Sequence, residues 1–525
     1  MSRMLKSLAP YWKSVVIIFV LLVGQAIGDL ALPQYTSNII DHGIQNGGVE
    51  HILPEKITSE EYETAKLFMT DDELNVWESC YTENGDLYEL TEKNSKKLDE
   101  YDETMVMPLI INNMMSSMTE TEFKSMLAEQ NGMDASVYDN VSIDMIGQQM
   151  GITLTTFTQT KDDEDGNPVE VTCVDIRPML QTMYEAGMMD KEALLSSRDQ
   201  MQTTMDTMGS SLVNSMAIAY AKNMDAKAGM DMDQLQSSYL WSSGLKMVGV
   251  AFLIAAIAVL IGLIASRIGA GIGRDLRGSV YKKVIGFSNA EMDKFSTASL
   301  ITRSTNDVQQ IQMVTVLMLR MVLYAPILGI GGIIKVYNTG AGMGWVIGLA
   351  VVVIMGFVGM LMVVAMPKFK AMQKLVDAVN LVSREILTGL SVIRAFGREQ
   401  KEEERFDKAN RELTKTNLFT NRTMTFMMPI MTVIMNGVSV LIIWVAANRI
   451  DEGVMQVGSM TAFITYAMQI IMSFLMLTMM SIMLPRAMVA ANRIEEVLKT
   501  DSSIADPKQP KTLEVHKGVV AFNHV

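Results

Sequence analysis

The sequence of 525 residues has few of the signatures that mark common catalytic sites. It contains no G-x-x-x-x-G-K-[ST] string, which excludes a phosphate-binding loop of that type within these residues. The G-x-S-x-G elbow of many serine hydrolases is also absent. Histidine and cysteine number only 4 and 2 and lack the spacing of a zinc site. We therefore predict no catalytic residue and no metal site in the residues given.

The two cysteines, Cys80 and Cys173, both lie in a strongly acidic segment. If that segment is outside the cell, a disulfide between them can form; two unpaired thiols are the alternative. Spacing along the chain does not decide between the two, because a bridge requires the Cα atoms to come close in space.

Charge is divided unevenly along the chain. Residues 42–240 carry 12 Lys and Arg against 37 Asp and Glu, while the remainder carries 32 against 21. An acidic segment is thus embedded in a basic, apolar chain. The cations flank apolar runs, so they indicate membrane topology and not nucleic-acid binding.

Six apolar stretches are long enough to cross a bilayer as helices, which takes about 20 residues. They are Ser14–Leu32, Leu245–Ala265, Val314–Ile334, Trp345–Met366, Met424–Ala447 and Met460–Leu484. The first run follows Arg3, Lys6 and Lys13 and has no small-residue cleavage site after it. We therefore predict a retained first span and not a signal peptide.

The connections between the spans differ in charge. Twelve Lys and Arg follow span four, between Lys368 and Arg422, and seven follow span two, between Arg267 and Arg303. The link after span three has none, and the link after span five has only Arg449. By the positive-inside rule both termini are predicted to be cytoplasmic and residues 46–237 extracellular.

The two basic connections are about 50 residues long and contain no proline between Pro367 and Pro429. Such stretches indicate that the spanning helices continue into the cytoplasm and turn back. Forty residues of helix extend about 60 Å, twice the hydrocarbon thickness. We expect these helices to act as levers that transmit motion between the membrane and the cytoplasm.

The acidic insert is predicted to be a mainly helical domain. Three Thr-x-x-Glu strings, at Thr58, Thr70 and Thr119, fit capping boxes. Alternating residues in Ile152–Thr160 and Val169–Asp175 predict one β-hairpin. The fold class is therefore an all-α polytopic membrane protein with a mainly helical extracellular insert. The predicted divisions are residues 1–45 (first span), 46–237 (insert), 238–500 (spans two to six) and 501–525 (linker and a first strand).

Polar residues inside the spans are the candidate substrate contacts: Gln25, Asp29, Arg320, Asn436 and Gln469. Intramembrane polar groups usually face a bundle interior or a cavity. They either line a substrate pathway or hold the bundle together, for example as an Asp29–Arg320 pair. The 48 methionines leave a similar choice between an adaptable ligand surface and ordinary membrane core.

Four segments resemble the type IV, exporter-type, ABC half-transporters. The stretch Phe287–Gln310 reads FSNAEMDKFSTASLITRSTNDVQQ and is similar to their first intracellular loop. Glu385–Phe406, EILTGLSVIRAFGREQKEEERF, resembles the second. Leu32–Ile44 and Pro485–Leu498 look like the outer end of the first helix and the exit from the sixth. The likeness is greatest to the insert-bearing subunit of heterodimeric multidrug exporters of Gram-positive bacteria.

The resemblance implies two coupling helices that dock into nucleotide-binding domains. The residues concerned are Ser288, Glu291, Asp293 and Phe295 in the first, and Val392, Arg394, Phe396 and Arg398 in the second. It also implies that spans four and five reach across to a partner subunit. Lys517–Val525, KGVVAFNHV, is similar to the first strand of the family's ATPase domain, so we expect that domain to follow. ATP and Mg²⁺ would bind there and not within these 525 residues.

The function that these observations predict is ATP-driven export of amphipathic compounds, drug-like molecules or else peptides or lipids, across a bacterial plasma membrane. The partners implied are a second half-transporter, the bilayer and the substrate, but no nucleic acid. One alternative is a sensor with an extracellular ligand-binding domain, although a sensor needs neither four further spans nor two long paired loops. Another is an ion-driven transporter, although such proteins interrupt their helices with Gly and Pro at the midplane.

Overall fold

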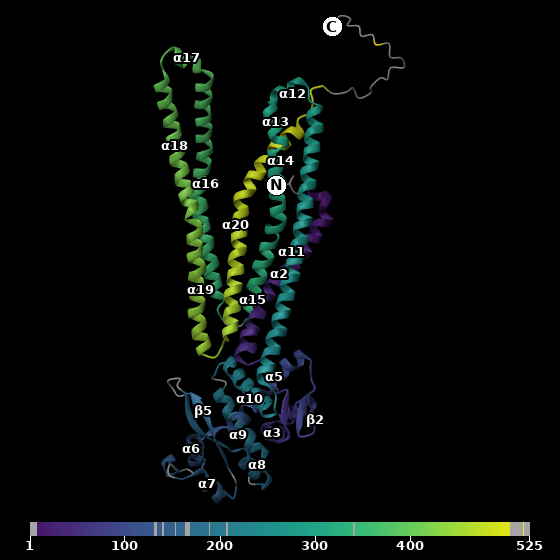
Figure 1. Cartoon of the computed structure of the whole chain (residues 1–525), viewed down its shortest axis with the longest axis vertical. Helices are drawn as coiled ribbons and strands as arrows, with labels where there is room; N and C mark the ends of the chain where they lie inside the picture. The colour runs from purple at the N-terminus through teal and green to yellow at the C-terminus, as the bar shows by residue number, and fades with distance from the viewer. Residues whose placement is uncertain are drawn as a thin grey trace.

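The computed structural model describes residues 8–130, 134–138, 141–152, 154–162, 168–187, 189–205, 208–339, 342–504 and 518. Two parts are evident: a long bundle of helices and, at one end of it, a compact domain formed by residues 46–231, which we call the insert domain (Figure 1). We call the two ends of the bundle the insert end and the tip end. The strand expected at Lys517–Val525 and the hairpin turn at residues 163–167 lie outside the described residues.

Six helical stretches of the described chain are long and apolar enough to cross a membrane, as the sequence predicts. They are Ala9–Gln45, Met232–Ile285, Thr297–Asn338, Gly344–Thr388, Glu399–Asp451 and Val457–Lys499. Each contains one of the six predicted apolar runs. Because backbone groups in hydrocarbon have no water to bond, a helix is the form in which such runs cross a bilayer.

The bundle is built from helices that differ greatly in length. Its first span consists of η1 (Ala9–Tyr11), α2 (Trp12–Asn38) and the π-helical η2 (Ile39–Gln45). The second is α11 (Met232–Ile285), and the third is α14 (Asn306–Leu317), η5 (Met318–Val322) and α15 (Tyr324–Asn338). The rest are α16 (Gly344–Thr388), α18 (Glu399–Thr425), α19 (Met427–Asp451) and α20 (Val457–Lys499).

The spanning helices continue far beyond the width of a bilayer, as predicted. The 54 residues of α11 extend about 80 Å, against about 30 Å of hydrocarbon. At the tip end, α12 (Asn289–Lys294) and α13 (Thr297–Ser304) join α11 to α14, and α17 (Leu390–Ala395) joins α16 to α18. The two tips, one with α12 and the other with α17, stand apart from each other (Figure 1).

The string Gly269-x-x-x-Gly273 brings α11 into close contact with α14. A Cβ atom on Gly269 would lie 2.5 Å from Cγ2 of Val316, and one on Gly273 would lie 2.6 Å from Oε1 of Gln312. At position 269 the branched Val316 and the backbone carbonyl of Gln312, at 3.3 Å, leave no room for a Cβ atom, whereas at position 273 the contact is with the movable end of the Gln312 side chain.

The insert domain is mainly helical, and short connections join most of its elements. Its helices are α3 (Ser59–Ala65), η3 (Lys66–Phe68), α4 (Asp71–Cys80), α5 (Ser95–Ser116), α6 (Glu120–Gln130), η4 (Ala135–Tyr138), α7 (Ile143–Met150), α8 (Arg177–Glu185), α9 (Lys191–Met205) and α10 (Ser210–Lys227). At all three predicted capping boxes, the threonine hydroxyl accepts from the backbone N–H of the glutamate three residues on.

Two antiparallel sheets of three strands complete the insert domain. The first has the order β1 (Lys56–Thr58), β3 (Leu87–Leu90), β2 (Tyr81–Asn84), and the sequence analysis did not anticipate it. The second has the order β4 (Met118–Thr119), β6 (Pro168–Asp175), β5 (Thr155–Asp162). Its β5–β6 ladder is the predicted hairpin, with Thr158 opposite Thr172.

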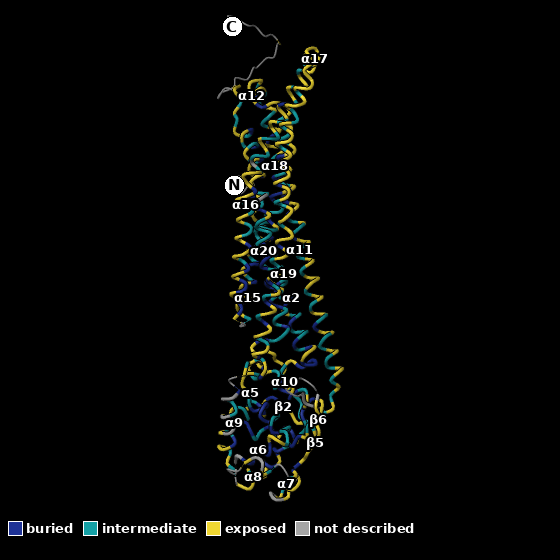
Figure 2. The backbone as a smooth tube through the Cα atoms, turned by 90° about the vertical axis from the view of Figure 1, so that its left-hand side faces the viewer, coloured by how far each residue is buried: buried dark blue, intermediate teal, exposed yellow. Residues whose placement is uncertain are grey.

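A buried ionic network joins the two halves of the insert core. The Arg177 guanidinium, 4 % exposed, donates to Asp175 at 2.7 Å and to Glu61 at 3.2 Å. Lys227 also reaches Glu61, at 2.6 Å. Burial alone would raise the pKa of Glu61, but its hydrogen bonds to Arg177 and Lys227 outweigh burial and lower it. The buried interior of this domain contrasts with the exposed residues of the tips (Figure 2).

Cys80 and Cys173 are both free and buried, so the disulfide considered from the sequence is not formed. The physical reason is their position. Cys80 ends α4 and packs in the cluster around Trp77 and Tyr62, whereas Cys173 lies on β6 in the other sheet, opposite Phe157.

Candidate functional site

Polar residues of three spans meet in the bundle around Asp29. The hydroxyl of Tyr324, on α15, donates to the Asp29 carboxylate, and Nε2 of Gln25 donates to the same oxygen at 3.4 Å. Nε2 of Gln469, on α20, donates to the backbone carbonyl of Asp29 at 2.9 Å. The structure thus brings together three of the five predicted residues and adds Tyr324.

The Asp29–Arg320 ion pair, suggested from the sequence as one way to hold the bundle together, is not formed, so that suggestion is wrong. Arg320 is exposed and forms no ion pair with a described residue, because Tyr324 takes the place opposite Asp29. Arg320 lies in the π-helical turn η5 and lines a cavity of about 340 Å³ together with Gln25 and Tyr324. π-Helical turns are rare and often occur at functional sites, where they redirect a side chain.

Tyr324 was missed from the sequence, although a signal was present. It follows Arg320 by four residues, a spacing that places two side chains on one face of a helix. Asn436, in contrast, does not join this group: it is exposed on α19 and is not among the described residues that line the cavity at Arg320.

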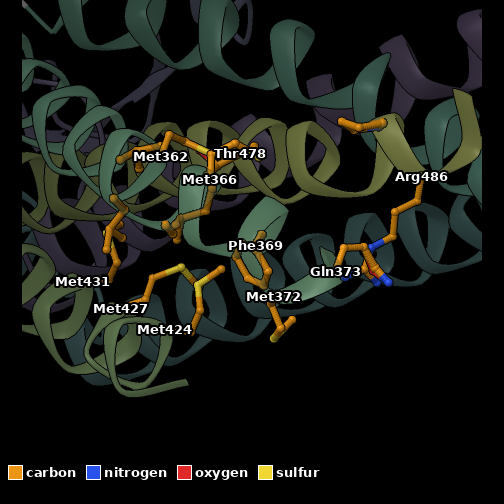
Figure 3. A pocket seen from close by; sticks show the side chains of 15 residues that line it. Met362, Met366, Phe369, Met372, Gln373, Met424, Met427, Met431, Thr478 and Arg486 are labelled. Atoms are coloured by element: carbon orange, nitrogen blue, oxygen red, sulfur yellow. The ribbon is translucent and has the colours of Figure 1, made fainter. Parts of the chain in front are cut away.

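A second cavity, of about 230 Å³, lies between α16, α19 and α20. Methionines form much of its wall (Figure 3): Met362, Met366, Met372, Met424, Met427 and Met431. Gln373 and Arg486 lie beside each other at one end (Figure 3). Because Met side chains are flexible and polarisable, this wall suits apolar ligands of varied shape. At these positions the geometry favours the adaptable surface over ordinary membrane core.

The first tip of the bundle carries α12 at the place where the resemblance implies a coupling helix. Ser288 and Glu291 form a capping box at its start, and Phe295 is buried at its end, stacked on Phe287. The hydroxyl and then the backbone N–H of Ser288 bond to Glu291 and lower its pKa to about 2. Of the four residues predicted here, three therefore shape the tip, and Asp293 is exposed.

The second tip, around α17, presents apolar side chains to solvent. Val392 is 60 % exposed and Phe396 is 76 % exposed, and Arg394 and Arg398 beside them are exposed as well. Apolar patches without a partner on the same chain are typical of interaction surfaces. All four residues predicted at this position are therefore available for contact.

The segment that follows the sixth span is bound to the first tip. The backbone N–H of Ser503 donates to Glu291 at 3.1 Å, and the Ser288 and Ser503 hydroxyls lie 2.8 Å apart. An ion pair of 3.0 Å joins Lys283 to Asp501. Movement of the chain beyond α20 would therefore be transmitted to α12 through these contacts.

At the insert end, Asp41 ties the first span to the sixth. Its carboxylate, 3 % exposed, accepts from the backbone N–H of Gly458 at 2.7 Å and from the Ser37 hydroxyl at 3.1 Å. A carboxylate in this position satisfies N–H groups that the first turn of α20 leaves unpaired.

Comparison with known proteins agrees with this architecture. The family described as the ABC transporter transmembrane region matches residues 202–474, about half of the chain. An uncharacterised ABC transporter ATP-binding protein of Mycobacterium tuberculosis is 37 % identical over 301 residues, which cover 57 % of this chain and 52 % of the relative.

Two other relatives are similar over about half of the chain. An uncharacterised ABC transporter ATP-binding protein of Bacillus subtilis is 30 % identical, covering 55 % of this chain and 50 % of its own. An ATP-dependent lipid A-core flippase of Pseudoalteromonas translucida is 23 % identical, with 48 % and 44 % covered. The chain thus spans about half the length of the curated relatives it matches.

Proposed function

Because this chain belongs to the family of ABC transporter transmembrane regions, we propose that it forms the membrane-spanning part of an ATP-driven exporter. The observation that carries the proposal is the reach of the helices. They leave the apolar zone, extend to two tips and end there in the short helices α12 and α17. A nucleotide-driven motor that moves these tips would transmit the motion to the cavities between the spans.

The orientation proposed follows from charge. By the positive-inside rule, the basic connections favour a cytoplasmic location for the tips and both ends of the chain, and the acidic insert domain would then lie outside the cell. This arrangement puts α12 and the exposed α17 patch where a cytoplasmic ATPase domain can dock.

ATP and Mg²⁺ have no binding motif in these 525 residues, so we assign them to a nucleotide-binding domain of the intact protein. A second half-transporter is the proposed partner, as a heterodimer. The side of α16, α18 and α19 that the chain itself leaves exposed, including Val352, Phe419 and Val433, is the surface proposed to meet it.

For the substrate we propose amphipathic compounds that carry a negative group. Arg486 lies at one end of the methionine-lined cavity, and Arg320 lines the separate cavity beside Tyr324. No described residue that lines either cavity is a carboxylate. Asp29, which would suit a cation, is already bonded to Tyr324 and Gln25. An apolar wall with a cation at one end matches a lipid-like or acidic drug-like molecule.

Transport by inverted membrane vesicles tests the proposal. The vesicles would contain the intact protein with its partner and be given a fluorescent amphipathic anion. We expect accumulation that requires ATP hydrolysis and that a proton gradient alone does not support. Uptake driven by the gradient without ATP, or none under either condition, would contradict an ATP-driven exporter.

A pair of variants separates the substrate class from the transport activity. Arg486→Gln is expected to slow uptake of the anion about tenfold or more, since a charged hydrogen bond contributes about 1.5–3 kcal/mol. The variant would leave uptake of a neutral dye unchanged, and Arg486→Lys would recover most of the anion uptake. Equal losses for the neutral and the anionic probe would contradict the role of Arg486 in substrate selection.

A further inference from the structure

A polar cavity of about 530 Å³ lies where the insert domain meets the insert end of the bundle. The segment after the first span, helices α5 and α10 and the residues before α20 all contribute to its walls. Its titratable lining consists of three carboxylates and two imidazoles: Glu50, Asp99, Asp102, His42 and His51. No Lys or Arg is among the described residues that line it, so the cavity has an uncompensated negative charge.

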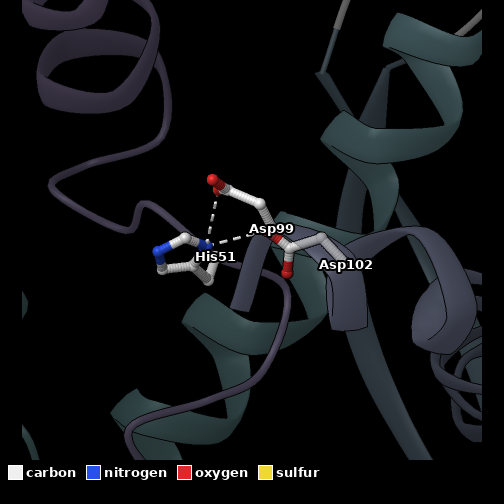
Figure 4. A group of neighbouring side chains, drawn as sticks. All are labelled: His51, Asp99 and Asp102. Carbon is white, nitrogen blue, oxygen red and sulfur yellow. Dashed lines mark hydrogen bonds and ion pairs between the residues drawn. The ribbon is translucent and has the colours of Figure 1, made fainter. Parts of the chain in front are cut away.

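Three of these side chains converge on one point. Nδ1 of His51 lies 2.8 Å from Oδ2 of Asp102 and 3.9 Å from Oδ1 of Asp99 (Figure 4). All three donor atoms lie within 4.8 Å of one another. Ligands held about 2.0–2.2 Å from one metal ion in a tetrahedral shell are roughly 3.3–3.6 Å apart. The observed separations bracket that range.

Two of the three donors are held in place before any ligand binds. The backbone N–H of Ile52 donates to the other oxygen of Asp102 at 2.9 Å, which fixes that carboxylate beside the neighbouring His51. Asp99 precedes Asp102 by three residues on α5, so both lie on one face of the helix. The Asp99 side chain is 67 % exposed and has room to close the remaining distance.

The imidazole of His42 also belongs to the lining of this cavity. Nδ1 of His42 is buried, and no described residue bonds to it. The three carboxylates of the lining, with no Lys or Arg beside them among the described lining residues, favour polar or cationic contents over an apolar group.

We propose that His51, Asp99 and Asp102 bind a divalent transition-metal cation, with water completing its coordination. An imidazole ligand favours ions such as Zn²⁺ over Mg²⁺ and Ca²⁺, which prefer oxygen alone. His51 would give up its Nδ1 proton to the solvent when the metal binds. The ion would then cross-link the start of the insert domain, directly after the first span, to α5. The assignment does not depend on the transport activity.

Cobalt(II) binding to the purified, tag-free chain in detergent tests this site. We expect one Co²⁺ per chain, seen as visible d–d absorption, with displacement by Zn²⁺. His51→Gln and Asp99→Asn are each expected to weaken binding about 100-fold or more, because losing a direct ligand exceeds the 10- to 100-fold cost of losing an outer-shell partner. Glu103→Gln, which changes an exposed acid of the same helix, is the matched control and should bind as the wild type does.

Three results would overturn the assignment: no stoichiometric Co²⁺ on the wild type, unchanged binding by both variants, or displacement by Ca²⁺ as readily as by Zn²⁺. The first would leave His51–Asp102 as a plain ion pair. Asp99 is mostly exposed, so Asp99→Asn keeps the test decisive even if His51→Gln fails to fold.

Discussion

Asp225 is a carboxyl group of α10 with almost no access to solvent. It is 1 % exposed and accepts a hydrogen bond of 2.8 Å from the backbone N–H of Lys56, which joins α10 to β1. Burial raises its pKa to about 7, against the smaller opposing effect of the Lys56 hydrogen bond. The side chain therefore holds its proton in the folded protein under conditions in which the unfolded chain, with a pKa of about 3.9, has lost it.

This difference predicts a pH-dependent stability. Between about pH 4 and pH 7 the folded state binds more protons than the unfolded state, so the contribution of Asp225 is complete at low pH and is lost as the pH rises. The steepest slope expected from one group is about 1.4 kcal/mol per pH unit. Asp225→Asn should remove this slope. The melting temperature of the variant minus that of the wild type should therefore increase between about pH 5 and pH 8.

The measurement is the difference in melting temperature between variant and wild type at each pH, followed by tryptophan fluorescence, to which the buried Trp77 of the insert domain contributes. Taking the difference removes the slopes of other groups, such as Glu61. Asp233→Asn, at an exposed acid of α11, is the control and should give a constant difference. A constant difference for Asp225→Asn as well would contradict the raised pKa.

At the residue scale, the sequence identified the polar residues of the spans but not their partners. An Asp29–Arg320 pair was one of the alternatives considered, because charges of opposite sign usually pair in an apolar medium. The π-helical turn at Met318–Val322 changes which face of the third span Arg320 occupies, and Tyr324 bonds to Asp29 instead. A helical wheel assumes a constant period, so a local change of period cannot be anticipated from it.

At the scale of elements, the contact between α10 and the link before α20 fixes the insert domain to the bundle. The backbone N–H groups of Ser211 and Leu212, in the first turn of α10, donate to the carbonyl of Gly453 at 2.9 and 3.2 Å. The first N–H groups of a helix have no partner one turn earlier, and that of Leu212 is shared between Gly453 and the carbonyl of Gly209 at 3.0 Å. The insert domain therefore shares backbone hydrogen bonds with the link between spans five and six, which a passive spacer would not need.

Glycine at position 209 makes this contact feasible. A Cβ atom there would lie 2.1 Å from the carbonyl carbon of Gly453. Gly209→Ala should therefore separate α10 from the link, at a cost of about 1–3 kcal/mol. Hydrogen exchange in residues 449–456 is the measurement, and we expect it to become about tenfold faster, which corresponds to about 1.4 kcal/mol.

The matched control is Gly244→Ala, on α11, where a Cβ atom would meet nothing within 4 Å. It should leave exchange in the link unchanged. If Gly209→Ala also left it unchanged, the insert domain would not be held by this contact.

The elements themselves could be predicted to differing degrees. The long spans follow from apolar runs that no other structure satisfies in a bilayer, and the β5–β6 hairpin follows from its alternation. The first sheet was missed because its strands have only three or four residues, too few for a period to appear. Asn84–Gly85 was nevertheless a usable signal, since Gly85 occupies the turn with a φ of 69°.

At the scale of the whole molecule, the structure separates charge along its length. The acidic insert domain occupies one end of the bundle and the basic connections the other (Figure 1). Composition was sufficient to predict this separation. The cavity between the insert domain and the bundle was not predictable, because His51 and Asp102 are 51 residues apart and only the tertiary fold brings them together.

The charge separation makes a definite prediction about orientation. If the basic connections are cytoplasmic, an impermeant maleimide should label a cysteine placed in the insert domain of intact cells, and should label one at the α17 tip only after the membrane is opened. Glu83→Cys on β2 and Phe396→Cys beside α17 are suitable, because both positions are exposed. The natural cysteines serve as the internal control: Cys80 and Cys173 are 1 % and 0 % exposed, so the wild type should react little in either preparation. Labelling of Phe396→Cys in intact cells with protection of Glu83→Cys would reverse the orientation and, with it, the side of the membrane on which an ATPase domain could reach the tips.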